Sequence, residues 1–437
     1  MSDNDIYQIS HSLTLPVHKV AQVYSDETSI SDKTIVVKEM GPLATTMQKF
    51  LENEATLKPI DSADMFTQFD CLASSDSIPE IMRAMNSLSP GNGQIGYRQV
   101  IALVHYLRRI VTTEITKRFG DFILPEHSHV FGSGGDFLKT LHASTAASII
   151  CSPLVKTLKT GTINVTSEHG SQHLVGALNI TSPYQNMDEV TEILEATGFA
   201  FLGLGDLGFP YSSQLRAVRQ EFWQVANLKI QETYKRTNNW RQAVNSTSIP
   251  IDVLKVVSPN SVILNPSKHS TGVHHISLIP YVLAIYIELE IEGMIAYGFD
   301  GIDELSTASL THSGDEKPNN LIIVVSKDYI HIESFSSSTL NIPLVDYNEI
   351  REEKSIEIEA KNLEKILSGK LKGAKRDFLV ANAALHLFAS EALPQNADDV
   401  DVMTVLSNNV NRINNLIDNY ELLDKLNELR NYAMLAQ

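Results

Sequence analysis

The sequence predicts an α/β protein with a small α-helical domain, in which a mostly parallel central sheet is flanked by helices. Three observations lead to this prediction. From about residue 125 onward, short apolar runs alternate with helical segments. Residues 62–120 carry apolar positions at helical spacing, and the chain from 360 onward does so again. Helices that alternate with short strands favour a parallel sheet covered on both faces.

The domain boundaries follow from changes in composition. Residues 1–60 are rich in Ser, Thr and Asp, and with β-type runs such as KTIVVKEM they predict an irregular N-terminal extension with a strand or two. Residues 61–122 are predicted to form the helical domain, because apolar residues recur at helical spacing in YRQVIALVHYLRRIVTTEI. Helices from about 183–225 are expected to join it. Residues 123–182 and 226–437 then form the α/β domain with its C-terminal helices.

The elements of the α/β domain follow in chain order. HSHVF, a Gly-rich loop and TLHASTAASII predict a strand, a loop and a helix, and GTINVTS, ITSP and FAFLGLG predict further short strands. VILNPSKHSTGVHHISLIPYVLAIYIELE predicts a loop and a long buried helix, and GMIAYGF the next strand. LIIVVSKDYIHIESF is typical of a β-hairpin. NLEKILSGK and RDFLVANAALHLFASEAL predict helices, and one long final helix is expected from about 397.

Composition excludes several classes of protein. Two cysteines, Cys71 and Cys151, cannot form a disulfide framework, which indicates a reducing compartment. The N-terminus lacks the basic and apolar regions of a signal peptide, and no apolar run is long enough for a membrane span. We therefore expect a cytoplasmic protein. The formal net charge of −17 argues against nucleic-acid binding, and the one basic stretch, LKIQETYKRTNNWRQ, is interpreted as a solvated surface segment.

A glycine-rich loop is the first candidate for a binding site. Gly132, Gly134 and Gly135 allow the backbone to approach a ligand closely, because no Cβ intrudes. Between a strand and a helix, such a loop directs several N–H groups to one point, where the helix dipole also favours an anion. Ser144 and Thr145 could add hydroxyl donors to a phosphate or oxygen ligands to Mg²⁺. The alternative is an ordinary tight turn.

An acidic pair is the second candidate. In GFDGIDELS, Asp303 and Glu304 lie just beyond the predicted end of a strand. Ligands of open α/β sheets bind at the carboxyl ends of the strands. Two adjacent carboxylates beside a phosphate are explained if a hard cation such as Mg²⁺ bridges them. The alternative is a helix N-terminus, where acidic residues are favourable without a ligand.

In this order and spacing, the motifs resemble those of the anthranilate phosphoribosyltransferase family, and more broadly of nucleoside phosphorylase-like transferases. The resemblance covers roughly residues 125–390. The family patterns Gly-Thr-Gly-Gly-Asp, Asn-x-Ser-Thr, Val-Arg-x-Glu-Leu and Asp-Gly-Leu-Asp-Glu correspond here to Gly132-Ser133-Gly134-Gly135-Asp136, His142-Ala143-Ser144-Thr145, Val218-Arg219-Gln220-Glu221-Phe222 and Asp300-Gly301-Ile302-Asp303-Glu304.

The resemblance implies a fold and an activity. It implies a helical domain beside an α/β domain, an active site in the cleft between them, and a homodimer. The reaction would transfer phosphoribose from phosphoribosyl pyrophosphate to a small aromatic amine such as anthranilate, as in tryptophan biosynthesis. Because the sugar develops oxocarbenium character as pyrophosphate leaves, catalysis would depend mainly on alignment and on neutralising the leaving group with Mg²⁺ and fixed donors.

The resemblance also assigns residues to these roles. Arg219 would face the carboxylate of the acceptor, a role suited to its planar guanidinium group. Mg²⁺ would be held by Ser144, Asp303 and Glu304. The donor's phosphates would be bound by Gly132, Ser133, Gly134, Gly135, Asp136, Ser144, Thr145, His169 and Gly170.

The chain departs from the family pattern at several positions. When the Lys-His-Gly-Asn motif is matched to EHGS, Glu168 replaces the family lysine. At about 4 Å, one such charge contact is worth on the order of 4 kcal/mol, so the exchange is not conservative. Phe137 replaces a glycine and His142 an asparagine, and the loop after EHGS is short. Lys139 could supply the missing cation, or it could be an ordinary exposed lysine.

Two alternatives to the enzyme therefore stay open. The first is a divergent, non-catalytic relative that acts as a ligand-binding, nucleic-acid-binding or regulatory protein. The second is a nucleoside phosphorylase, which would also need a cation at position 168. His269, His274 and His275 lack further ligands at metal-site spacing and are predicted to be loop histidines. The sequence assigns no role to an insertion at 224–262.

Overall fold

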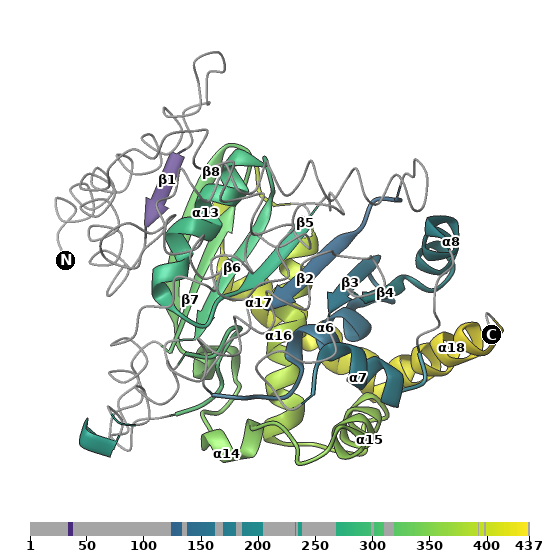
Figure 1. Ribbon diagram of the computed structural model, residues 1–437. Coiled ribbons are helices and arrows are strands. Elements are labelled where there is room, and N and C mark those ends of the chain that lie inside the picture. The colour runs from purple at the N-terminus through teal and green to yellow at the C-terminus, as the bar shows by residue number, and fades with distance from the viewer. Residues whose placement is uncertain are drawn as a thin grey trace, which may run out of the picture.

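A single sheet organises the structure, which is a computed structural model (Figure 1). Among the residues that it describes, the strand order is β1-β8-β7-β6-β5-β2-β3-β4. The predicted helical domain, 61–122, and nearly all of the insertion at 224–262 lie outside these residues. The structure describes residues 34–37, 124–132, 138–161, 169–180, 186–203, 232, 235–237, 268–298, 301–309, 319–391, 393–396 and 399–435.

Most of the described strands run parallel. The run β6-β5-β2-β3-β4 is parallel throughout, and β7 is antiparallel to both of its neighbours, β6 and β8. β1 pairs parallel with β8. The predicted mostly parallel sheet is therefore confirmed. The strands are β1 (Thr34–Val37), β2 (Ser128–Gly132), β3 (Thr157–Gly161), β4 (Phe199–Gly203), β5 (Lys268–Gly272), β6 (Gly293–Gly298), β7 (Asn320–Val325) and β8 (Tyr329–Phe335).

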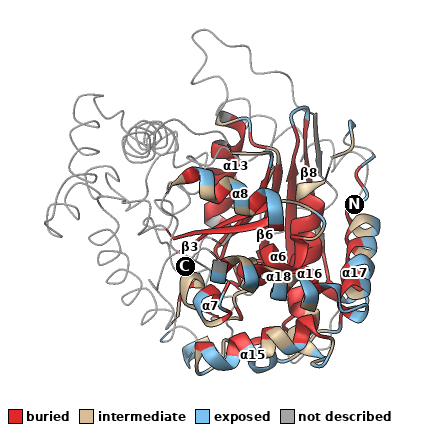
Figure 2. Cartoon of the chain, turned by 90° about the vertical axis from the view of Figure 1, so that its right-hand side faces the viewer, coloured by how far each residue is buried: buried red, intermediate tan, exposed pale blue. Residues whose placement is uncertain are grey.

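Helices cover both faces of the sheet. α13 packs on one face, whereas α6, α16 and α17 form a layer on the other, and the strands between them are buried (Figure 2). α8 packs against β4 and α18. The helices are α6 (Ala143–Cys151), α7 (Ser171–Ala177), α8 (Met187–Thr197), α13 (Ile279–Glu288), α14 (Tyr347–Ile350), α15 (Ile356–Leu367), α16 (Ala374–Ser390), α17 (Val402–Asp418) and α18 (Glu421–Leu435), with 3₁₀ turns η1 (Ile276–Leu278) and η2 (Ser337–Leu340).

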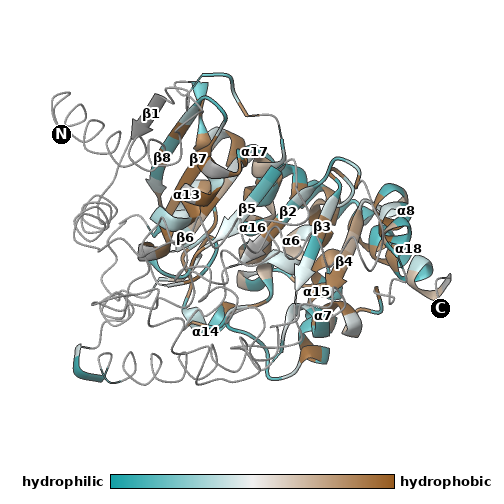
Figure 3. Cartoon of the chain, turned by 45° about the horizontal axis from the view of Figure 1, so that its top comes forward, coloured by the Kyte–Doolittle hydropathy of each residue, from teal (hydrophilic) through white to brown (hydrophobic). Residues whose placement is uncertain are grey.

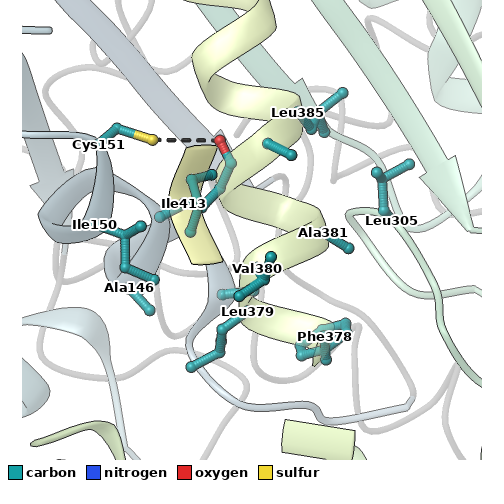
Figure 4. Close-up of a cluster of buried hydrophobic side chains, with 14 of the residues drawn as sticks. Ala146, Ile150, Cys151, Leu305, Phe378, Leu379, Val380, Ala381, Leu385 and Ile413 are labelled. Carbon is teal, nitrogen blue, oxygen red and sulfur yellow. Dashed lines mark hydrogen bonds between the residues drawn. The ribbon is translucent and has the colours of Figure 1, made fainter. Parts of the chain in front are cut away.

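The core lies between the sheet and α16, which is buried along most of its length. Leu379, Val380 and Leu385 of this helix belong to a cluster that also includes Ile150 of α6 (Figure 4). In the same cluster the Cys151 thiol donates to the carbonyl of Ala383 at 3.2 Å, and burial raises its pKa. Cys151 is therefore a structural residue, because a reactive cysteine needs an accessible thiolate.

Strand β5 corrects the sequence-based prediction. Its residues, Lys-His-Ser-Thr-Gly, were predicted to lie in a loop, because none of them is apolar. Instead they form an interior strand between β2 and β6, and four of the five are buried. In Figure 3 β5 runs from teal to near white, whereas β7 is brown. Hydropathy alone could not identify such a strand, since buried strands of parallel sheets are usually continuous apolar runs.

Three other predictions can be compared with the structure. The hairpin is confirmed as β7 and β8. The single final helix is wrong: α17 ends at Asp418, and Tyr420 adopts a left-handed conformation with φ of 63° before α18 begins. The strand expected in GTINVTS lies earlier, at Thr157–Gly161, and residues 162–168 lie outside the described part of the chain.

Within the described ranges, no helix is both long and apolar enough to cross a membrane.

Candidate functional site

The candidate site lies where the parallel strands end. Gly132, the last residue of β2, pairs with Gly272, the last residue of β5. The loop after β6 carries Asp303 and Glu304 across both strand ends. A Cβ added to Gly132 would lie 2.5 Å from Asp303 Oδ2, and one added to Gly272 only 1.3 Å from the backbone carbonyl oxygen of Asp303. The structure therefore brings the start of the glycine loop and the acidic pair into direct contact, and this contact requires glycine in both strands.

Lys159 is a site residue that the sequence analysis missed. It lies on β3, is 4% exposed, and its Nζ donates to the carbonyl of Thr160 at 2.8 Å. Burial lowers the pKa of Lys159 from 10.5 to about 8, although the carboxylates of Glu304 and Asp303 act in the opposite direction. A lysine is therefore buried within electrostatic range of the acidic pair.

A sequence signal for Lys159 did exist. Lys159-Thr160-Gly161 has the Lys-x-Gly spacing of the Lys-His-Gly-Asn motif, earlier in the chain than EHGS. It was overlooked because the strand was placed at GTINVTS, which leaves Lys159 outside it. Glu168 lies outside the described residues. Lys139, the other candidate cation, is half-buried, and its backbone carbonyl accepts the Tyr347 hydroxyl at 2.8 Å.

The first turn of α6 carries the two predicted hydroxyl groups. Ser144 is half-buried, and Thr145 is completely buried. The Thr145 hydroxyl makes no hydrogen bond within the described part of the chain. Because buried polar groups are nearly always hydrogen-bonded, this hydroxyl is a candidate ligand-binding group. The loop residues Ser133, Gly134, Gly135 and Asp136, and also Phe137 and Arg219, lie outside the described residues.

His169 and Gly170 lie at the N-terminus of α7. The N–H of Gly170 donates to His173 Nδ1 at 3.3 Å, and a Cβ added to Gly161 would lie 2.2 Å from Ser171 Oγ. The start of α7 therefore rests against the carboxyl end of β3, close in sequence to Lys159. Gly132, His169, Gly170 and the acidic pair thus gather at one edge of the sheet, as expected for ligand sites in open α/β folds.

His142 connects three elements around the site. Its Nδ1 and its backbone N–H both donate to Glu359 Oε1 of α15 at 2.8 Å, and its Nε2 donates to the carbonyl of His169 at 3.1 Å. Burial alone would lower the pKa of His142, but Glu359 raises it above its usual value. With acceptors on both ring nitrogens, the imidazolium form fits this position.

A buried hydrogen-bond chain underlies the strand ends. His129 of β2 bonds to Thr160 at 3.0 Å and to His269 of β5 at 3.1 Å, and His269 bonds to the Tyr286 hydroxyl of α13 at 2.9 Å. The Tyr286 hydroxyl donates to the carbonyl of Met294 at 3.2 Å. Burial lowers the pKa of His269 to about 3, so this ring is neutral. The prediction that His269 is a loop histidine is wrong, because it is a hydrogen-bonded residue of an interior strand.

The comparisons with known proteins agree with these motifs. No protein-family model matches the chain. The chain is 27% identical over 310 residues to the anthranilate phosphoribosyltransferase of Methanococcus maripaludis, which covers 70% of this chain and 80% of the relative. It is 28% identical over 307 residues to the enzyme of that name from a Thermoanaerobacter species, covering 69% of this chain and 75% of the relative.

Solved structures show the same fold. Anthranilate phosphoribosyltransferase from Thermus thermophilus superimposes with a TM-score of 0.63 at 16% identity, over 88% of this chain and 99% of that chain. The Saccharomyces cerevisiae enzyme, solved in complex with PRPP and Mg, gives a TM-score of 0.57 at 16% identity, over 91% and 99%. In sequence and in fold, the chain is therefore similar to anthranilate phosphoribosyltransferases.

Proposed function

We propose that this protein transfers phosphoribose from phosphoribosyl pyrophosphate to a small aromatic amine of the anthranilate class, with Mg²⁺. The observation that carries the proposal is the contact of Gly132 and Gly272 with Asp303 at the carboxyl ends of β2 and β5, with the buried Lys159 of β3 within electrostatic range of the acidic pair. The similarity of the chain to anthranilate phosphoribosyltransferases supports the same assignment. Relatives from Saccharomyces cerevisiae are known in complex with PRPP and Mg, and with 4-fluoroanthranilate.

The acidic pair fits a magnesium ion. Glu304 is only 6% exposed, and the Asp303 carboxylate lies against Gly132 rather than in open solvent. Carboxylate and hydroxyl oxygens are the ligands that Mg²⁺ prefers, and it usually binds through one or two carboxylates together with substrate phosphates. Asp303 and Glu304, with Ser144, would hold it. When bound, Mg²⁺ would neutralise charge on the pyrophosphate as it leaves.

Lys159 would supply the family's cation in place of residue 168. Its ammonium group is desolvated, so its attraction to a phosphate is screened far less than that of a surface lysine. Because it lies within electrostatic range of Glu304 and Asp303, it would bind an anion together with the metal of the acidic pair. Its hydrogen bond to the Thr160 carbonyl fixes its direction before the donor arrives.

The remaining residues would align the donor. The Thr145 hydroxyl, which makes no hydrogen bond within the described residues, would donate to a phosphate oxygen. The reaction needs little acid–base chemistry, because the acceptor amine attacks a sugar carbon that already carries oxocarbenium character. Alignment and neutralisation of charge would provide most of the acceleration.

The acceptor and the setting of the reaction rest on the family relationship. Arg219 would bind the acceptor's carboxylate through its planar guanidinium group. The enzyme would act as a cytoplasmic homodimer in tryptophan biosynthesis. These assignments extend the proposal beyond the residues that the structure describes.

A second candidate function is that of a non-catalytic binding protein. The observation in its favour is His142, which replaces the family's asparagine. Both of its ring nitrogens already hydrogen-bond within the protein, to Glu359 and to the carbonyl of His169. Such a protein would keep the phosphate site and lose turnover.

One experiment distinguishes the two functions. The protein is incubated with phosphoribosyl pyrophosphate, Mg²⁺ and anthranilate, and product is followed by the loss of anthranilate fluorescence, while melting temperature is measured with the donor and Mg²⁺ alone. The proposed enzyme shows both turnover and a raised melting temperature, since a ligand that binds the native state stabilises it. A raised melting temperature without turnover supports the binding protein. If millimolar donor produces neither turnover nor a raised melting temperature, the donor assignment itself is contradicted.

A further inference from the structure

The acidic pair lies in a loop that has no regular secondary structure to hold it. Isolated β-bridges fix the loop only at Ile302 and Ala308. Between these two points lie Asp303 and Glu304, whose carboxylates a metal site must hold at a defined separation. Some other restraint is therefore needed on this part of the backbone.

Asn382 of α16 provides one restraint. Its Oδ1 accepts the N–H of Leu305 at 2.8 Å, and its Nδ2 donates to the carbonyl of Leu305 at 3.1 Å. The same Nδ2 donates to the carbonyl of Phe378 within α16 at 3.0 Å. The side-chain amide thus pairs with both backbone groups of the residue next to Glu304, as a neighbouring strand would.

Asn320 of β7 repeats this pattern on the next residue. Its Oδ1 accepts the N–H of Ser306 at 2.6 Å, and its Nδ2 donates to the carbonyl of Ser306 at 2.9 Å. Nδ2 of Asn319 donates to the same carbonyl at 2.9 Å. Two consecutive residues after the acidic pair are therefore held from different elements, each by a two-way amide contact.

Both asparagines are buried. Asn382 is 3% exposed and Asn320 is 0% exposed. Leu305 lies beside Ala381 and Leu385 of α16 in the core (Figure 4). Burying an amide costs free energy unless its hydrogen bonds are made, and here the loop backbone makes them. Because α16 also packs against α6, one helix supports both the acidic loop and the helix that carries Ser144.

We propose that Asn382 and Asn320 are positioning residues that set the separation of the Asp303 and Glu304 carboxylates for the divalent cation. The inference rests on the proposed function, because it assigns these residues to the Mg²⁺ of that reaction. Groups that orient metal ligands without touching the metal typically change its affinity about 10- to 100-fold when removed.

The test compares Asn382→Ala with Asn409→Ala. Asn409 of α17 is equally buried, at 2% exposed, and its Nδ2 donates to the carbonyl of Ala384 of α16 at 3.5 Å, so it contacts the same helix without contacting the acidic loop. At a fixed, saturating concentration of phosphoribosyl pyrophosphate, the readout is the Mg²⁺ concentration that gives half of the ligand-induced rise in melting temperature. Asn382→Ala is expected to raise that concentration about 10-fold or more, and Asn409→Ala to leave it within about twofold.

Asn320→Ala provides an independent second variant, which decides the question if Asn382→Ala does not fold. If both variants need the same Mg²⁺ concentration as wild type while Asp303→Ala needs far more, the positioning inference is overturned and the proposed function stands. If wild-type protein shows no Mg²⁺-dependent rise, the inference and the metal assignment are both overturned.

Discussion

Strands β5 and β7 are both interior strands of one sheet, yet they are stabilised in different ways. β7 carries Leu-Ile-Ile-Val-Val after its first residue, and each of these side chains is at most 1% exposed. β5 carries Lys-His-Ser-Thr-Gly and is nearly as buried. For β7 the removal of apolar surface from water is sufficient. For β5 the polar groups must find partners inside the protein.

The partners of β5 explain why a polar strand is tolerated at this place. His269 and Thr271 both bond to the Tyr286 hydroxyl at 2.9 Å. Gly272 leaves the space that the backbone of Asp303 occupies. β5 thus supports the candidate site by hydrogen bonds and close backbone approach, whereas β7 supports the fold by apolar burial. Changes around β5 should affect function, and changes in the apolar residues 321–325 of β7 should affect stability.

The largest expected effect on stability is in β7. Ile322 is fully buried in the main apolar cluster, so Ile322→Ala should lower the free energy of unfolding by about 2–5 kcal/mol. Urea unfolding measures it. Donor affinity, measured where the variant is still folded, should stay close to that of wild type. A large loss of donor affinity in folded protein would show that the apolar residues of β7 also shape the site.

Lys159→Met on β3 should give the opposite result. The variant should lose at least about 100-fold in kcat/KM, or about 2.7 kcal/mol of transition-state stabilisation. Stability should be unchanged or higher, because burial of this ammonium group is unfavourable, as its lowered pKa shows. Steady-state kinetics and urea unfolding are both required. Full activity in Lys159→Met would refute the role proposed for this lysine.

The same contrast explains what the sequence could predict. The β7–β8 hairpin, α6 and α16 follow from apolar periodicity. The contact between Gly132 and Asp303 was predictable in outline, because the carboxyl ends of parallel strands meet at one edge. β5 could not be found in this way, since polar residues resemble a loop unless their buried partners are known. Those partners, such as Tyr286, come from elements distant in the chain.

Gly272→Ala tests the close approach of β5 to the acidic loop, because it adds only a methyl group. The added Cβ would lie 1.3 Å from the Asp303 carbonyl oxygen, so strand and loop must separate. We expect the free energy of unfolding to fall by about 1–3 kcal/mol or more, and donor binding to depend less on Mg²⁺. Gly176→Ala is the matched control. An added Cβ there meets nothing within 4 Å, and in a helix the exchange should stabilise by roughly 0.5–1 kcal/mol. Equal behaviour of the two variants would contradict the close approach at Gly272.

The smallest expected effect is a dependence of stability on pH that comes from buried histidines near β5. Burial lowers the pKa of His269 and of His386 from 6.5 to about 3. Both rings stay neutral in the native state, while the unfolded chain takes up protons below about pH 6.5. Their contribution is therefore fully present above pH 6.5 and is lost as the pH falls toward 3.

The loss should amount to about 1.4 kcal/mol for each histidine at pH 5.5 relative to neutral pH. Urea unfolding between pH 7.5 and 5.5 measures it, a range above that in which ordinary carboxylates titrate. His386→Leu should remove the contribution of one histidine from the dependence of the free energy of unfolding on pH. The substitution disturbs little else, because within the described residues the Nε2 of His386 hydrogen-bonds only to the Thr157 hydroxyl, at 3.4 Å. If the slope does not change in this variant, His386 is not buried in its neutral form, and the polar interior around β5 is more hydrated than the structure indicates.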